Sequence, residues 1–259
     1  MPTVSSIYTS AVKSLALQQR ESVSVGPSGI AEDRRFHLVD GRGGLLTQRQ
    51  RPQLARVLSH YDTETEHLTM TFPDGLKLSG QVELGEPVRT PVWGRLVSGQ
   101  VAAGEWNEAL SRFCGGPVRL VKTGDAGLSF DEYPISLLSQ ASIDLLSQKT
   151  GGVKQFEGRR FRPNFLLDGC SPHEEDSWLG GVIAVGPELR LRLVAPDPRC
   201  AITTVDPDTG QRDFDTPRLL LTYRPAVRAP YFGVYGVVEN PGAVSVGDAV
   251  EVAVPPPRR

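Results

Sequence analysis

The sequence predicts a mainly β fold in two parts, built as barrels or sandwiches, with few short helices. Short β-branched runs recur along its 259 residues between turn signals, and the chain holds 27 glycines and 21 prolines. Apolar and polar residues alternate with a period of two in LRLRLV (189–194) and VSVGDAVEV (244–252), which is typical of half-buried strands. Because such runs return at regular spacing, they favour barrels or sandwiches over βαβ units.

Five runs are the clearest strand candidates, because they combine β-branched or alternating residues with turn signals. In chain order they are SVSVGPSGI (22–30), FHLVDGRGGLLT (36–47), HLTMTFPDGLKLSG (67–80), LRLRLVA (189–195) and VSVGDAVEVAV (244–254).

Two segments have helical patterns. Residues 104–113 (GEWNEALSRF) have helical periodicity and end before Cys-Gly-Gly, which suits a C-cap. Residues 136–147 (SLLSQASIDLLS) are the second candidate, with Ser139 as the N-cap of the regular part and a Gly-Gly pair beyond its end. Residues 124–134 read as a long loop, so we place the domain boundary there. The predicted domains are residues 1–123 and residues 124–259.

Composition excludes several classes of protein. The formal net charge of −2 does not fit a nucleic-acid binder or a polybasic membrane surface. No apolar run approaches the roughly 20 residues that span a bilayer, and the first residues show no secretory signal. We therefore expect a cytoplasmic protein with no membrane and no nucleic-acid partner. Three distant cysteines without a CxxC pair, and four scattered histidines, argue against a disulfide framework or a zinc site.

The stretch GRRFRPNFLLDGC (158–170) contains a candidate anion site. On an extended strand, alternate residues share a face, so Arg160, Arg162 and Asn164 would point one way. Two guanidinium groups and an amide on one face would make a fork suited to phosphate or carboxylate. The alternative is a solvated outer face of a barrel. The proline inside the run favours an edge strand or a bulge.

Cys200 lies between Arg199 and an apolar run, ahead of the acidic turn DPDTG (206–210). A thiolate is a soft metal ligand, and a neighbouring arginine favours the charged form of the thiol. The alternative is a buried, inert cysteine. The DPDTG turn fails as a calcium loop, because Gln211 stands where that loop needs glycine. It is better interpreted as a hairpin turn.

Other polar motifs give weaker signals. Lys13 beside Ser14, and Arg34 beside Arg35, contribute to a site only if the fold brings them to the Arg162 segment. We expect HEEDSW (173–178) to be a solvated loop, and Cys170, in a Gly-Cys turn, to be structural.

Taken together, the motifs resemble one known family. Their order resembles MOSC-domain proteins that carry an N-terminal MOSC β-barrel domain, and most of all the mitochondrial amidoxime-reducing component and its bacterial relatives. The resemblance covers roughly residues 3–253, and its specificity comes from several motifs in one order. These are AVKS (11–14), DRRF (33–36), FRPNFLLDGC (161–170), EDSW (175–178), RCAITTVDPDTG (199–210), VVENPG (237–242) and VGD (246–248).

The resemblance implies a molybdenum cofactor, a pterin dithiolene that carries one molybdenum. It assigns the protein thiolate on the metal to Cys200. It also implies an oxidoreductase that reduces N-hydroxylated compounds such as hydroxylamines and amidoximes. By matching motifs, the cofactor-binding residues are Lys13, Ser14, Arg35, Arg162, Asn164 and Arg199, with Tyr235 near the site.

The resemblance also bears on partners. Some bacterial relatives carry a four-cysteine iron–sulfur domain, whereas this chain has no cysteine after Cys200. We therefore expect a monomer that takes electrons from a separate donor protein, of ferredoxin or cytochrome type with its reductase. No general acid is obvious, since Asp206 and Asp208 suit the turn better. Three alternatives stay open, namely a sulfur carrier with a persulfide on Cys200, a molybdopterin-binding storage protein, and a non-catalytic interaction barrel.

Overall fold

The computed structural model describes residues 1–224 and 229–254, and it confirms a mainly β fold with few helices. The largest sheet runs in the order β19-β15-β16-β17-β13-β14-β1-β2. Its strands are β1 (Thr3–Thr9), β2 (Gln18–Arg20), β13 (Ile135–Ser139), β14 (Phe165–Asp168), β15 (Val182–Val185), β16 (Leu189–Pro198), β17 (Tyr231–Asn240) and β19 (Val250–Val254).

A five-stranded sheet runs in the order β10-β11-β12-β5-β6, and two three-stranded sheets accompany it. The five strands are β5 (Phe36–Asp40), β6 (Leu45–Leu46), β10 (Glu83–Val92), β11 (Arg95–Ala103) and β12 (Val118–Thr123). The smaller sheets hold β3 (Ser22–Gly26), β4 (Gly29–Ile30) and β18 (Gly242–Ser245), and β7 (Leu58–Asp62), β8 (His67–Thr71) and β9 (Lys77–Gln81).

Each half of the molecule has its own core. Phe36, Leu68 and Leu120 are fully buried in the first half, and Phe165 and Leu191 in the second. Burial of one such side chain contributes about 1.5–3 kcal/mol. Alternation predicts the strands well, since β8 and the first part of β16 bury every second residue.

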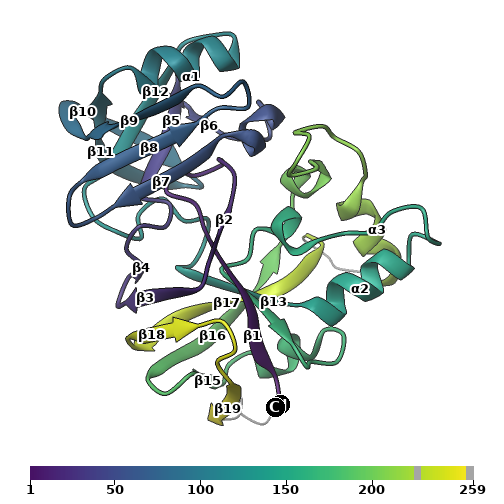
Figure 1. Cartoon of the computed structure of the whole chain (residues 1–259). Helices are drawn as coiled ribbons and strands as arrows, with labels where there is room; N and C mark the ends of the chain where they lie inside the picture. The colour runs from purple at the N-terminus through teal and green to yellow at the C-terminus, as the bar shows by residue number, and fades with distance from the viewer. Residues whose placement is uncertain (225–228, 255–259) are drawn as a thin grey trace.

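The N-terminal segment connects the two halves. Figure 1 shows β1 beginning in the large lower sheet and leading up toward the upper half. It pairs there with β14, and β3 pairs with β18 near the end of the chain. The predicted division at residues 123 and 124 stays a prediction, but the first strands of the chain pair with its second half.

The described helices are α1 (Trp106–Cys114), α2 (Gln140–Gln148) and α3 (Thr216–Tyr223). The predicted end of α1 is confirmed, because Gly115 adopts φ 67° there. The predicted cap of α2 is also confirmed, since the Ser139 side chain accepts a hydrogen bond from the Ser142 N–H. The predicted start at Ser136 is wrong. Residues 135–139 form β13, whose side chains are all buried in the middle of the large sheet.

Two local predictions are wrong. Residues 158–161 form a 3₁₀ turn, Arg162 has φ 58°, and the strand begins only at Phe165. Arg160 and Arg162 therefore do not share a strand face. The HEEDSW segment is not a solvated loop either, because Glu174–Trp178 forms a 3₁₀ turn that buries Glu175 and Trp178. The Glu175 carboxylate accepts hydrogen bonds from the Ser139 N–H and the Ser142 hydroxyl, which explains its burial.

Among the described residues, no helix has the length and apolarity needed to cross a membrane.

Candidate functional site

A cavity of about 440 Å³ opens where the first half, the 124–134 loop and the end of β16 meet. We call it the Cys200 cavity. Its wall includes Arg34, Trp93, Asp131, Arg162, Asp197 and Cys200.

Cys200 presents an exposed thiol at this cavity. Strand β16 ends at Pro198, and Cys200 then caps the short 3₁₀ turn Ala201–Thr204 in an extended conformation. The Thr203 N–H and hydroxyl both donate to the Cys200 carbonyl, at 3.1 and 3.0 Å, and fix the turn. The alternative of a buried, inert cysteine therefore fails for Cys200.

The other two cysteines have different surroundings. Cys114 is buried, and burial raises the pKa of its thiol to about 11. Cys170 is half-buried, and burial together with nearby carboxylates raises the pKa of its thiol to about 12. Both remain protonated at neutral pH, in keeping with a structural role for Cys170.

Arg199 is a fixed part of the wall. Its guanidinium donates to the backbone carbonyls of Phe232 at 2.7 Å and Phe161 at 2.6 Å. It also forms an ion pair with Asp197 at 2.9 Å. Arg199 therefore joins β17, the 158–161 turn and the Cys200 turn.

Arg34 and Arg162 give the cavity a buried positive charge. Arg34 forms an ion pair with Asp33 and donates to the Arg162 carbonyl at 3.2 Å. The Nη2 atom of Arg162 is buried without a hydrogen-bond partner among the described residues. Burial, reinforced by Arg34, lowers the pKa of Arg162 to about 10. An anion placed here would satisfy the Nη2 donor that residues 1–224 and 229–254 leave unpaired.

Asn164 fixes the neighbouring framework. Its side-chain oxygen accepts from the Ser136 N–H at 3.1 Å, and its amide donates to Asp33 at 3.0 Å. Asp33 in turn accepts from the Ser10 N–H at 2.7 Å. Asn164 thus connects β13 to the carboxylate that holds Arg34.

Asp131 connects the loop to the first half. It accepts from the Lys13 ammonium at 2.7 Å and from the Trp93 indole N–H at 2.8 Å. Burial would raise the pKa of Asp131, but Lys13, Arg34 and Trp93 together outweigh burial and hold that pKa well below its usual range. Arg95 donates to the Asp131 carbonyl at 2.9 Å and adds a second connection to the loop.

Most residues predicted for the site do meet at the Cys200 cavity. Arg162, Asn164, Arg199, Cys200 and Tyr235 line it, and Lys13 reaches it through Asp131.

Ser14 and Arg35 do not line the Cys200 cavity. Ser14 is buried with φ 72°, and its carbonyl accepts from Gln48. Arg35 donates instead to Thr123 and to the Gly124 carbonyl, at 3.4 and 3.2 Å. Its neighbour Arg34, with φ 50°, occupies the wall.

Sequence reasoning missed several wall residues, among them Trp93, Asp131 and Asp197. Trp93 and Asp131 lie in a hairpin turn and a loop that carry no motif, so no local signal marks them. Asp197 is different, because Pro196 and Pro198 flank it and mark an irregular strand end.

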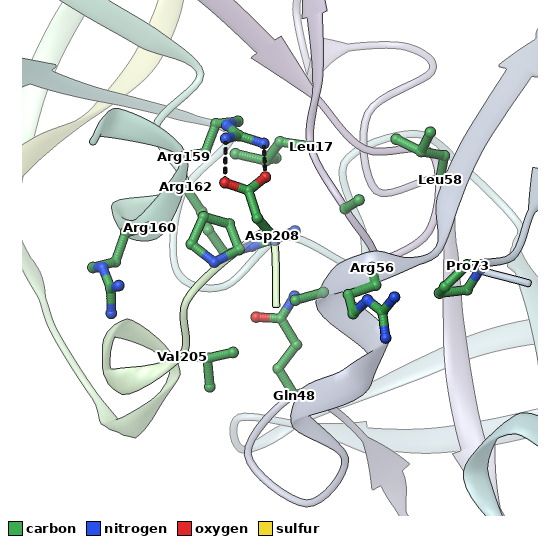
Figure 2. A pocket seen from close by; sticks show the side chains of 13 residues that line it. Leu17, Gln48, Arg56, Leu58, Pro73, Arg159, Arg160, Arg162, Val205 and Asp208 are labelled. Carbon is green, nitrogen blue, oxygen red and sulfur yellow. Dashed lines mark hydrogen bonds and ion pairs between the residues drawn. The ribbon is translucent and has the colours of Figure 1, made fainter. Parts of the chain in front are cut away.

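A neighbouring cavity of about 320 Å³ shares Arg162 with the first (Figure 2). We call it the Arg159 cavity. Arg159 makes a two-bond contact with Asp208 there, at 2.9 and 3.1 Å. Asp206 accepts from the Asp208 and Thr209 N–H groups, and Gly210 has φ 66°. These bonds support the turn-forming role of Asp206 and Asp208.

The Cys200 cavity suits an anionic cofactor with a soft metal. It offers one exposed sulfur ligand and a wall in which cations outnumber carboxylates. The described lining cations are Arg34, Arg49, Arg95, Arg162 and Arg199, against Asp131, Glu132 and Asp197.

Known proteins resemble this chain along its whole length. Residues 111–251 match the family model of the MOSC domain, and residues 1–117 that of the MOSC N-terminal beta barrel domain. The mitochondrial amidoxime-reducing component 1 of Homo sapiens is 29% identical, over 96% of this chain and 82% of the relative. The mitochondrial amidoxime reducing component 2 of Bos taurus is 28% identical over the same shares. Among solved structures, the YuaD protein of Bacillus subtilis matches with a TM-score of 0.45 and 14% identity, over 96% of this chain and 94% of that one.

Proposed function

Because this chain belongs to the MOSC-domain family, with both the MOSC domain and its N-terminal β-barrel domain, we propose that it is a molybdenum-cofactor-dependent reductase of N-hydroxylated compounds. The observation that carries the proposal is that one cavity holds both the exposed Cys200 thiol and Arg162, whose buried Nη2 atom has no hydrogen-bond partner in the described part of the chain. The relatives named as amidoxime-reducing components support the reaction class.

Several residues of the Cys200 cavity would each hold a different part of the cofactor. Cys200 would supply a thiolate to the molybdenum, which is a soft-ligand role. Arg162 and Arg34 would face the anionic part of the pterin group with charge-assisted hydrogen bonds. Asn164 would keep Arg34 in place through Asp33. When bound, the cofactor would supply the electrons that break the N–O bond.

The reaction needs two electrons and two protons, because R–NH–OH becomes R–NH₂ and water. We propose that a separate donor protein of ferredoxin or cytochrome type, served by its own reductase, delivers the electrons. The expected monomeric state and cytoplasmic location stay predictions.

Metal analysis of protein made in a host that synthesises the cofactor tests the proposal. We expect near-stoichiometric molybdenum in the wild type and loss of the metal in Cys200→Ala. Cys170→Ala is the matched control and should keep the metal, since its thiol lies outside the Cys200 cavity. Turnover of a hydroxylamine with a reduced dye should follow the same pattern. A well-folded wild type without molybdenum would refute the proposal.

The exposed thiol also suits a sulfur carrier, which is the second candidate. The same preparations separate the two, because a carrier would hold sulfane sulfur on Cys200 and no molybdenum. A cofactor-storage protein would hold molybdenum but show no turnover.

A further inference from the structure

Asp197 is a buried carboxyl in the wall of the Cys200 cavity to which no role has been given. Its side chain is almost inaccessible to solvent, yet it contributes to the cavity wall. The pairing of β16 with β17 shifts register between Pro196 and Pro198. Prolines cannot donate to the ladder, and such irregularities re-aim side chains. The strand end therefore turns a carboxyl toward the cavity instead of toward solvent or a core.

Fixed partners hold this carboxyl. Arg199 pairs with it at 2.9 Å, and two backbone carbonyls anchor Arg199 itself. The Tyr235 hydroxyl, from β17, lies near enough to Asp197 to lower the pKa of its carboxyl. The Tyr235 ring lies against Tyr133 of the loop, with ring centroids 5.7 Å apart. The carboxyl thus has a defined position beside the turn that carries Cys200.

The surroundings of Asp197 favour its protonated form. Burial raises the pKa of Asp197 to about 7, and the charge of Asp131 adds to the rise. Arg199, the Tyr235 hydroxyl and Arg34 oppose that rise. The pKa of Asp197 therefore lies close enough to neutral for the carboxyl to hold and release a proton there.

Other acids near the cavity suit the task less well. Asp131 is tied to Lys13 and Trp93, and its pKa is far below neutral. Asp208 is engaged by Arg159, and Glu132 is exposed to solvent. A general acid works best with a pKa near the working pH and a place beside the reacting atoms.

We propose that Asp197 is the general acid of this site, and that it protonates the leaving oxygen of an N-hydroxylated substrate in the Cys200 cavity. The inference rests on the proposed function. Cleavage of the N–O bond takes two electrons, which the donor protein would supply and the bound cofactor would deliver. One proton passes from Asp197 to the hydroxyl oxygen, which leaves as water. A second proton from solvent reaches the nitrogen, and solvent reprotonates Asp197.

The test compares the molybdenum-loaded wild type with Asp197→Asn, which keeps the shape and an acceptor for Arg199. In the wild type, kcat should fall above about pH 7, as the acid loses its proton. In Asp197→Asn, kcat should be about 100-fold lower, and the fall in kcat above about pH 7, which we call the pH limb, should disappear. The molybdenum content should be unchanged. Asp168→Asn, an exposed carboxylate on β14, is the charge-matched control and should keep the wild-type limb.

Infrared difference spectra provide a readout apart from activity. The wild type should show a carboxylic-acid band that disappears as pH rises through about 7, and Asp197→Asn should lack it. Tyr235→Phe removes the hydroxyl that lowers the pKa of Asp197. The infrared band and the fall in kcat should therefore both move to higher pH, by up to about one unit. If Asp197→Asn fails to fold or to hold the metal, this second variant decides.

Different outcomes refute different claims. A loaded Asp197→Asn enzyme with the wild-type pH limb overturns the role of Asp197 and leaves the proposed function standing. A Tyr235→Phe enzyme whose band moves while its limb stays also overturns that role. A wild type that takes up no molybdenum, or that has no turnover, overturns the proposed function, and the inference falls with it.

Discussion

Arg160 and Arg162 lie two residues apart, but we expect replacement of Arg160 to lower stability and replacement of Arg162 to lower molybdenum binding. The Arg160 side chain is 1% exposed and makes two bonds to Asp213, at 2.8 and 2.9 Å. It also contacts Asp206 at 3.3 Å and donates to the Thr203 carbonyl at 3.2 Å. Arg160→Met keeps most of the apolar stem and removes the charge. We therefore expect the folded protein to be less stable but to bind as much molybdenum as the wild type.

The size of that loss follows from the exposure of the partners. Breaking a buried ion pair by removing one member costs about 3–5 kcal/mol. The two carboxylates are 19% and 25% exposed, and Lys154 still pairs with Asp213 at 2.6 Å. We therefore reduce the expected cost to about 2–3 kcal/mol. For a chain of this size, that lowers Tm by about 4–12 °C.

Thermal unfolding and molybdenum content, measured on the same preparations, check this prediction. Arg192→Met is the control, because its ion pair with Glu239 is exposed and is worth about 0–1 kcal/mol. Folded Arg160→Met should hold as much molybdenum as the wild type, whereas Arg162→Met should hold less at a nearly unchanged Tm. If Arg160→Met unfolds at the temperature of the control, or loses metal while keeping its Tm, the structural assignment of Arg160 is wrong.

Three further predictions concern thiols, pH and a glycine. In protein made without the cofactor, iodoacetamide at neutral pH should label the exposed Cys200 and leave Cys114 and Cys170 unmodified, because burial raises the pKa of both other thiols. Mass spectrometry of peptides would show a second labelled site if this is wrong. The pKa of the Asp131 carboxyl is lower in the folded chain, so its stabilising contribution is present above about pH 4 and is lost as pH falls. In urea titrations, the free energy of unfolding of Asp131→Asn should therefore fall less than that of the wild type between neutral and acidic pH. Equal losses would contradict the Lys13–Asp131 contact. Gly233→Ala should lower Tm more than Gly115→Ala. Both glycines have positive φ, but a Cβ at Gly233 would lie 2.5 Å from the Leu137 carbonyl, whereas Gly115 faces open space. Equal Tm changes would mean that β17 moves freely away from β13.

The sequence predicts local features well where the signal is local. Ser139 caps α2 as expected, because the cap uses a side chain and an N–H three residues apart. The signal for the end of α1 is also local, since it lies in the glycine that follows the helix. The start of α2 has no such local signal, because residues 135–139 become a strand only through pairing with β14 and β17 on either side.

The residues of the Cys200 cavity are predicted where a sequence motif marks them and missed where distant segments decide their surroundings. Cys200, Arg162 and Asn164 belong to motifs and do meet at one cavity. The choice between Arg34 and Arg35 depends on the left-handed backbone at Arg34, which no pattern in DRRF reveals. The environment of Asp131 depends on the distant Lys13, and that of Asp197 depends on the distant Tyr235 as well as on the neighbouring Arg199.

The pairing of the first strands with the last part of the chain has a consequence for synthesis. β1 needs β14, and β3 needs β18, which ends at Ser245. A ribosome therefore releases the first 30 residues long before β14 and β18 exist, although β2 and β4 are already there to pair with β1 and β3. Contacts so distant in sequence slow folding and leave the other edges of β1 and β3 open in the meantime.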